Sequence, residues 1–164
     1  MTTLRPARPE DREHLLAVYA STRAEELAPV PWTEEQKAAF VKMQFDAQDA
    51  HYKEHYEGAT YEVIEVDGAP AGRLYVLRRP SEIRLVDIAL LPAFRRAGVG
   101  TWLLAGLIAE ARTRAVPLTI HVEMFNPARR LYERLGFAPV EEHGVYLLME
   151  RLPEIDQAAE ARVS

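Results

Sequence analysis

Hydrophobic residues alternate with polar ones through the middle of the chain, whereas on either side they recur every three to four positions. Alternation is the pattern of a strand, and the longer spacing is that of a helix. Two alternating runs flank Asp67 and Gly68, a dipeptide that favours a tight hairpin turn. A third run over residues 82–91 is mostly apolar, which is typical of a central strand, and Pro92 ends it.

Helical spacing covers residues 11–27, 33–56, 98–113 and 126–137. Apolar residues that predict the buried face of the third helix are Val99, Leu103, Leu104, Leu107, Ile108 and Ala111. The fourth helix starts with Asn126 as N-cap and Pro127 in its first turn, and Gly136 ends it. With β-rich runs near both ends, the order β-α-α-β-β-β-α-β-α-β-β predicts an α/β fold with a mixed sheet.

The helix over residues 33–56 has two different faces. Thr33 and Gln36 form a capping box at its start. The stripe predicted to face the core consists of Phe40, Met43, Ala47 and Ala50. The opposite, polar face carries Gln44, Gln48, His51 and His55. Residues 51–55 also fit the H-x-x-E-H pattern of zinc peptidases. Nothing else in the chain resembles such a domain, so we expect no metal.

The composition is that of an ordinary globular protein of 164 residues, with 48% hydrophobic and 27% charged residues, which predicts one domain. The net charge of −5 argues against nucleic acid as a partner. The chain has no cysteine, which excludes disulfides, thiolate metal sites and a cysteine nucleophile. No run approaches the roughly 18 apolar residues of a membrane span, and no signal segment is evident at the start. We expect a cytoplasmic protein without a membrane partner. The domain is expected to end at residue 152, and residues 153–164 are expected to form a polar tail.

Paired cations and glycines stand where the third helix begins, in the stretch Arg95-Arg96-Ala97-Gly98-Val99-Gly100. A helix N-terminus presents unpaired N–H groups and a positive dipole end, and glycine lets an anion approach the backbone. This joint therefore predicts a diphosphate site. The Walker pattern is absent, and a Rossmann motif would need glycine where Leu103 stands. Glu123 lies where a ribose-binding carboxylate would be, so dinucleotide binding stays as a minor alternative.

The same stretch resembles the R/Q-x-x-G-x-G/A signature of the GNAT N-acetyltransferase superfamily. The segment NPARRLYERLGF resembles a second motif of that family through Asn126, Ala128, Tyr132, Gly136 and Phe137. The two motifs lie on consecutive β-α units, and the resemblance covers residues 2–152. It implies a mixed, mostly antiparallel central sheet of about six to seven strands flanked by about four helices.

The resemblance also implies an activity. Family members transfer an acetyl group from acetyl-CoA to a primary amine by direct attack in a ternary complex, and a homodimer would fit them. The alternative is a CoA- or acyl-CoA-binding sensor of the same fold without turnover. The acceptor stays open among small amines, amino acids, antibiotics, peptide N-termini and protein lysines.

In the family, backbone N–H groups of the glycine loop bind the pyrophosphate, and the preceding strand pairs with the pantetheine arm. Here that strand segment is residues 88–91. The implied cofactor-binding residues are Leu90, Leu91, Arg95, Arg96, Ala97, Gly98, Val99, Gly100, Thr101, Asn126, Arg129 and Tyr132. For Asn126 an N-cap role stands beside this one, and Arg129 is equally well an exposed helix arginine.

Tyr132 is the expected general acid, because the family places this hydroxyl beside the CoA sulfur. A thiol with a pKa near ~8.5 can take a proton from a phenol with a pKa near ~10 at modest cost. Leu131 and Leu135 would form the core stripe of the helix and leave Tyr132 on its flank. A packed core tyrosine is the structural alternative.

Asp87 is unusual because it lies in the apolar third strand, where a carboxylate needs a reason. It could be the general base, a ligand of the substrate or the partner of an arginine. Glu65, Glu123 and His121 are weaker candidates for the base.

Candidate acceptor residues come from the polar helix face and from the hairpin, and they are Gln44, Gln48, Arg73 and Tyr75. An arginine among them would suggest a substrate carboxylate, whereas the net negative charge favours a cationic acceptor. The sequence supports both.

Overall fold

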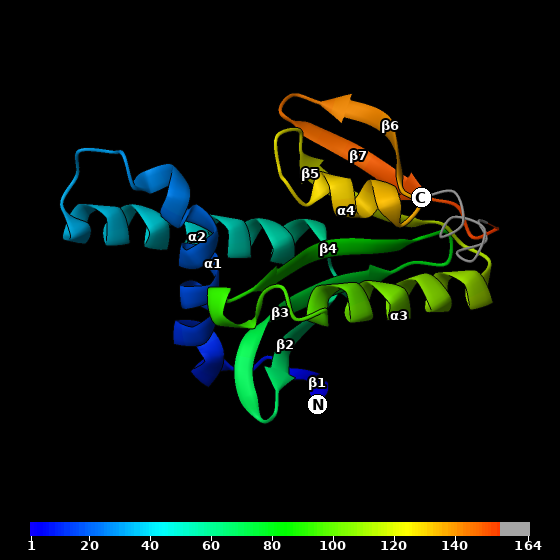
Figure 1. Cartoon of the computed structure of the whole chain (residues 1–164), viewed down its shortest axis with the longest axis horizontal. Coiled ribbons are helices and arrows are strands. Elements are labelled where there is room, and N and C mark those ends of the chain that lie inside the picture. The colour runs from blue at the N-terminus through cyan, green and yellow to red at the C-terminus, as the bar shows by residue number, and fades with distance from the viewer. Residues whose placement is uncertain (155–164) are drawn as a thin grey trace. The chain divides into compact units, whose positions relative to one another are not determined.

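The computed structural model describes residues 1–154. Most of the expected polar tail, residues 155–164, lies outside the described residues. Figure 1 shows the elements in chain order. They are β1 (Thr2–Pro6), α1 (Arg12–Leu27), α2 (Glu34–His55), β2 (Thr60–Val66), β3 (Ala69–Arg78), β4 (Ile83–Leu90), α3 (Val99–Arg114), β5 (Leu118–Glu123), α4 (Arg129–Arg134), β6 (Ala138–His143) and β7 (Tyr146–Arg151). Short 3₁₀ turns cover Pro9–Asp11 and Pro92–Phe94. Over these residues the order predicted from the sequence is confirmed.

The strands form one seven-stranded sheet in the order β1-β2-β3-β4-β5-β7-β6. The β1–β2, β5–β7 and β6–β7 pairs are antiparallel, whereas β4 and β5 are parallel. The expected mixed, mostly antiparallel sheet is therefore confirmed. The register of β4 with β5 pairs Ile83 with Leu118 and ends where Leu85 meets Ile120, although both strands continue beyond it.

The chain divides into two compact units, and β3 and β4 run through both. The first unit comprises residues 1–75 and 87–100, with α1, α2, β1 and β2. Its helices pack through Tyr19, Val41 and Phe45. The second unit comprises residues 76–86 and 101–154 of the described chain, with most of α3 and all of α4, β5, β6 and β7.

Local sequence signals locate most elements correctly. Asp67 and Gly68 both have positive φ, 50° and 82°, as a primed hairpin turn requires. The Thr33–Gln36 capping box forms at the start of α2, with hydrogen bonds of 2.9 and 3.1 Å. The buried face predicted for α3 is confirmed, since its members Val99, Leu103, Leu104, Leu107, Ile108 and Ala111 are all buried.

Two helix predictions are wrong in detail. The N-cap of α4 is Ala128 rather than Asn126, because Asn126 Oδ1 instead accepts from the Ala128 N–H at 2.9 Å in a turn before the helix. In α2, the stripe predicted to face the core is largely outside: Met43 is 60% exposed, and Ala47 and Ala50 are exposed. Val41 and Phe45 are buried instead.

Asp11 anchors the entry to α1 in a polar network. Its carboxylate accepts two hydrogen bonds from the Arg5 guanidinium, both 2.8 Å, and one of 2.7 Å from the Arg8 N–H. The bonds from Arg5 contribute most to holding the pKa of Asp11 well below its usual range.

We expect Asp11→Asn to lower the free energy of unfolding at pH 7 by about 2 kcal/mol, because it removes charge-assisted bonds. A carboxyl with a lowered pKa stabilises the fold fully above its unfolded pKa of ~3.9 and loses this effect as the pH falls further. The difference between wild type and variant should therefore shrink between about pH 4 and pH 2. Urea unfolding at pH 7, 4 and 2.5 measures it, with the exposed Asp67→Asn as control. A difference that does not change with pH would contradict this role.

Candidate functional site

The loop between β4 and α3 contains two residues with a left-handed backbone. Arg96 and Gly98 have positive φ, 63° and 80°. A Cβ added to Gly98 would meet no atom within 4 Å, and residues 95–98 are exposed. In residues 1–154 no hydrogen bond is seen from the backbone N–H of Arg96, Ala97 or Gly98. The first turn of α3 adds further N–H groups that its own carbonyls cannot satisfy. The loop therefore offers an open set of donors that suits an anion.

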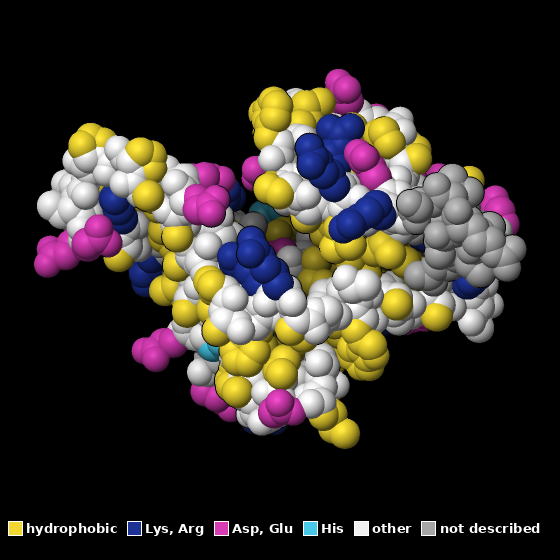
Figure 2. Space-filling view, viewed as in Figure 1, with side chains coloured by type: hydrophobic (Ala, Val, Ile, Leu, Met, Phe, Trp, Pro, Cys, Tyr) yellow, Lys and Arg dark blue, Asp and Glu magenta, His cyan; other side chains and the backbone are white. Residues whose placement is uncertain are grey.

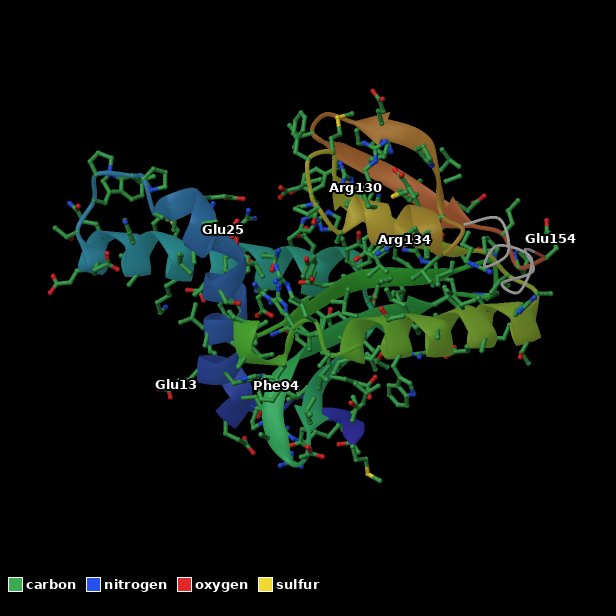
Figure 3. All side chains as sticks on the ribbon, viewed as in Figure 1. Glu13, Glu25, Phe94, Arg130, Arg134 and Glu154 are labelled. Carbon is green, nitrogen blue, oxygen red and sulfur yellow. The ribbon has the colours of Figure 1, made fainter. Side chains whose placement is uncertain are left out.

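Arg95 has its side chain turned back to the protein. Its Nε donates to the Leu90 carbonyl at 2.9 Å, and its Nη2 donates to Ser21 Oγ of α1 at 3.2 Å. Phe94 lies just before Arg95, in the turn that follows β4 (Figure 3). Arg95 thus ties the loop to α1, whereas Arg96 extends into solvent as a cation at the loop.

The second half of β4 is less enclosed than the first. Ile83 and Leu85 are fully buried, whereas residues 87–91 are half-buried. On the β3 side the backbone is closed, since the Leu91 N–H donates to the Ala71 carbonyl at 2.8 Å. A Cβ on Gly72 would lie 2.1 Å from the Ala89 carbonyl oxygen, so the two strands touch there. The register with β5 stops before residue 87, as described above.

A buried charge pair lies beside this part of β4, within the first unit. Arg73 of β3 is only 3% exposed and forms an ion pair with Asp87 of β4. Its Nη2 also donates to Gln48 Oε1 of α2 at 2.9 Å. The guanidinium carbon lies 5.1 and 5.7 Å from the ring centroids of Tyr75 and Tyr19. Of the three roles open to Asp87, the structure shows the arginine partner.

Tyrosines surround the pair. The Tyr52 hydroxyl lies 3.5 Å from Asp87 Oδ2, and the ring of Tyr75 contacts Tyr52 and Tyr61 at centroid distances of 6.0 and 4.8 Å. Burial raises the pKa of Tyr75 to about 12. Burial and the Asp87 carboxylate raise the pKa of Tyr52 still further above its usual value. Both phenols therefore stay protonated at neutral pH.

The fourth helix carries the other catalytic candidate, in the second unit. Tyr132 is 6% exposed and packs against Phe137 at a centroid distance of 5.7 Å. Leu131 and Leu135 are only half-buried, so the expectation that they form the core stripe is wrong. Tyr132 is the buried residue of this six-residue helix, so the aromatic side chain takes the place that we predicted for the leucines. Arg129 donates to Glu133 at 2.9 Å and to the Met124 carbonyl at 3.4 Å.

Two further arginines extend from α4. Arg130 and Arg134 are exposed and lie one helical turn apart (Figure 3). The space-filling view shows dark-blue side chains over this helix (Figure 2). This helix therefore offers positive charge to solvent.

The weaker candidates for the base have protein partners. Glu65 accepts from Arg5 Nε at 3.2 Å, and His121 Nδ1 lies 3.2 Å from Arg84 Nη1. Burial, Arg84 and His143 lower the pKa of His121. His51 and His55 stack at 4.2 Å, and the described residues contain no group of three His, Cys, Asp or Glu side chains that could hold a metal ion.

An apolar groove of about 660 Å³ lies between α1 and α2. Its lining is mainly alanine and leucine, with Glu13, Glu34 and Lys37 among the lining residues. It lacks the converging buried polar groups found around Arg73. No helix within residues 1–154 is long and apolar enough to cross a membrane.

Comparison with known proteins agrees with this geometry. The model of the acetyltransferase (GNAT) family matches residues 20–137, and the chain belongs to this family. Ribosomal protein bS18-alanine N-acetyltransferase of Haemophilus influenzae is 39% identical over 61 residues, which span 37% of this chain and 42% of that protein. A Bacillus subtilis candidate for the same enzyme is 28% identical over 83% of this chain and 80% of its own. The crystal structure of the PaiA N-acetyltransferase from Thermoplasma acidophilum, in complex with coenzyme A, has the same fold. Its TM-score is 0.69 at 16% identity, over 93% of this chain and 99% of that one.

The structure joins three of the four predicted acceptor residues, Gln48, Arg73 and Tyr75, in direct contact with one another or with Asp87. Sequence reasoning missed Tyr19, Tyr52 and Tyr61. A signal existed for Tyr52, because it continues the four-residue spacing of Gln44 and Gln48 along α2.

Proposed function

We propose that the protein is an acetyl-CoA-dependent N-acetyltransferase that acetylates a primary amine. The observation that carries this proposal lies within the first unit. Three features follow one another along residues 87–100. They are the buried polar cluster around Asp87, the less enclosed segment of β4 and the open glycine loop. Membership of the family and the likeness to a fold solved with coenzyme A support the choice of carrier.

The loop fits the diphosphate of such a carrier, because the position of a Gly98 Cβ is open and the neighbouring N–H groups point to no protein acceptor within residues 1–154. We assign diphosphate binding to the backbone from Arg96 to Thr101, with Arg96 as a nearby cation. Backbone groups of residues 88–91 would pair with the pantetheine arm as an added strand. Asn126 and Arg129 remain proposed contacts from the α4 region.

The thioester supplies an activated acyl carbon. A neutral amine attacks that carbon, a C–N bond forms, and the C–S bond breaks. Tyr132 is proposed to donate the proton that the departing sulfur takes up. Protonating Asp87 would leave the buried Arg73 without its counter-charge. We therefore propose that Asp87 binds the acceptor and that water removes the proton from the amine.

Direct attack is favoured because the chain has no cysteine to carry an acyl group. The relatives are named as alanine N-acetyltransferases of a ribosomal protein. We accordingly propose the α-amino group of a protein N-terminus as the first acceptor to test, with the cytoplasm as the site of action.

Thiol release from acetyl-CoA tests the activity. We expect release with a peptide that begins with alanine, and mass spectrometry should place the acetyl group on its α-nitrogen. The matched control is the same peptide with its N-terminus formylated and with one internal lysine, so that the lysine side chain is its only amine. Release with no amine, while calorimetry still shows CoA binding, would support a non-catalytic sensor instead.

A further inference from the structure

The inward side of α2 carries two amides, Gln44 and Gln48, beside the buried Val41 and Phe45. Gln44 and Gln48 are half-buried, and the apolar Met43 faces solvent. Burying amides instead of available apolar side chains costs free energy unless they have a hydrogen-bonding task. Gln48 has one in Arg73. Gln44 Oε1, Tyr61 Oη and Arg73 Nε are buried and have no hydrogen-bond partner within the described residues.

The two charges of the cluster are not equally available. Arg73 is 3% exposed, and its Nη2 is bound by both Asp87 and Gln48, so a carboxylate from outside would have to displace them to reach this nitrogen. Of its buried nitrogens, only Nε lacks a partner within the described residues. The Asp87 side chain keeps 18% of its surface exposed. Its contacts with Arg73 and Tyr52 both involve Oδ2, which leaves Oδ1 for another donor. The accessible charge is therefore negative.

The surroundings of Asp87 suit a cation with polar neighbours. Neutral tyrosine rings attract a cation through their π faces. The free oxygen of Gln44 can accept a hydrogen bond from an amide N–H, and the Tyr61 hydroxyl can donate one to an amide carbonyl. Neither group is charged, so neither would compensate a carboxylate.

The position of Asp87 on β4 agrees with an acceptor site. Asp87 precedes Leu90 by three residues, or about 10 Å of strand. If the pantetheine arm follows residues 91 to 88, as the proposed function requires, the thioester end reaches the neighbourhood of Asp87.

We propose that Asp87, Tyr52, Tyr75, Gln44 and Tyr61 form an acceptor subsite that binds a protonated amine followed by an amide and rejects an amine next to a free carboxylate. The substrate class is the N-terminal residue of a peptide, and free amino acids are excluded. Asp87 selects by charge, and Arg73 holds it in place. This inference rests on the proposed function.

Alanine and alaninamide test the charge rule, with acetyl-CoA saturating. The wild type should show a kcat/KM at least tenfold higher for alaninamide, because alanine brings its carboxylate close to that of Asp87. In Asp87→Asn the ratio of kcat/KM for alaninamide to kcat/KM for alanine should fall at least tenfold. The reason is that Arg73, without Asp87 as its partner, can bind the substrate carboxylate of alanine. The amines of the two substrates have different pKa values, but the effect of this difference on kcat/KM cancels when the ratio for the wild type is compared with the ratio for Asp87→Asn.

Asp87→Asn leaves a buried arginine without its partner and could unfold the protein, so a second variant is needed. Tyr61→Phe removes only a hydroxyl that has no hydrogen-bond partner among residues 1–154. It should lower kcat/KM for alaninamide about fivefold through KM and leave alanine unchanged. Tyr56→Phe, at the residue that directly follows α2, is the matched control. If the wild type acetylates both substrates equally, or Tyr61→Phe affects neither, the subsite is wrong and the enzyme proposal stands. If the wild type acetylates no amine at all, the proposed function itself fails.

Discussion

Replacing Gly98 with tryptophan is expected to lower the affinity for CoA at least 100-fold, because the indole would occupy the space in front of the loop. The position of a Cβ on Gly98 is open now, and the φ of 80° suits glycine alone. Each hydrogen bond from a backbone N–H to the charged diphosphate contributes ~1.5–3 kcal/mol. Losing two or more of these bonds lowers the affinity for CoA by about 100-fold or more. Calorimetric titration with CoA measures the loss directly, without turnover.

The chain provides a closely matched control for backbone strain. Gly68 has a φ of 82°, and a Cβ there would also meet no atom within 4 Å, but it lies in the β2–β3 hairpin turn. Gly68→Trp should therefore cost similar stability, about 1–2 kcal/mol for an L residue at this φ. It should leave the affinity for CoA unchanged. Equal affinities of Gly98→Trp and wild type would refute the assignment of the diphosphate to this loop.

The sequence predicted the order of elements because each boundary depends on neighbours along the chain. The Asp67-Gly68 turn, the Thr33 capping box and the positive φ of Gly98 are all local. The α3 core stripe was also predictable, since its apolar face is continuous and no polar face competes with it. The loop that forms half of the candidate site follows from the same local signals.

The orientation of α2 could not be predicted in this way. Its pattern shows two faces, but periodicity does not say which face is buried when both are weak. Arg73 is buried and needs oxygen acceptors, and Gln48 supplies one from α2. That requirement arises only when β3 and the helix come together. The pairing of Arg73 with Asp87 likewise depends on how β3 and β4 align, so the sequence left three roles open for this carboxylate.

Tyr132→Phe is expected to lower the rate of acetyl transfer by about 10²- to 10³-fold at pH 7, which lies within the range of about 10²- to 10⁴-fold for general acid catalysis. The change keeps the ring, so its packing against Phe137 and the fold should persist. Affinity for CoA should change less than threefold, because the hydroxyl acts on the departing sulfur. Single-turnover kinetics are the right measurement, since product release can hide the chemical step.

The pH dependence distinguishes a proton donor from a residue that only packs. A thiolate departs without a proton once the pH exceeds the thiol pKa of ~8.5, so the acid matters less there. The ratio of wild-type to variant rates should therefore fall as the pH rises from 7 to 9.5, and any effect of pH on the amine cancels in this ratio. Tyr146→Phe, 44% exposed on β7 in the same unit, should leave the rate unchanged at every pH. A ratio for Tyr132→Phe that stays constant across this range would assign Tyr132 to packing and leave the sulfur to be protonated by water.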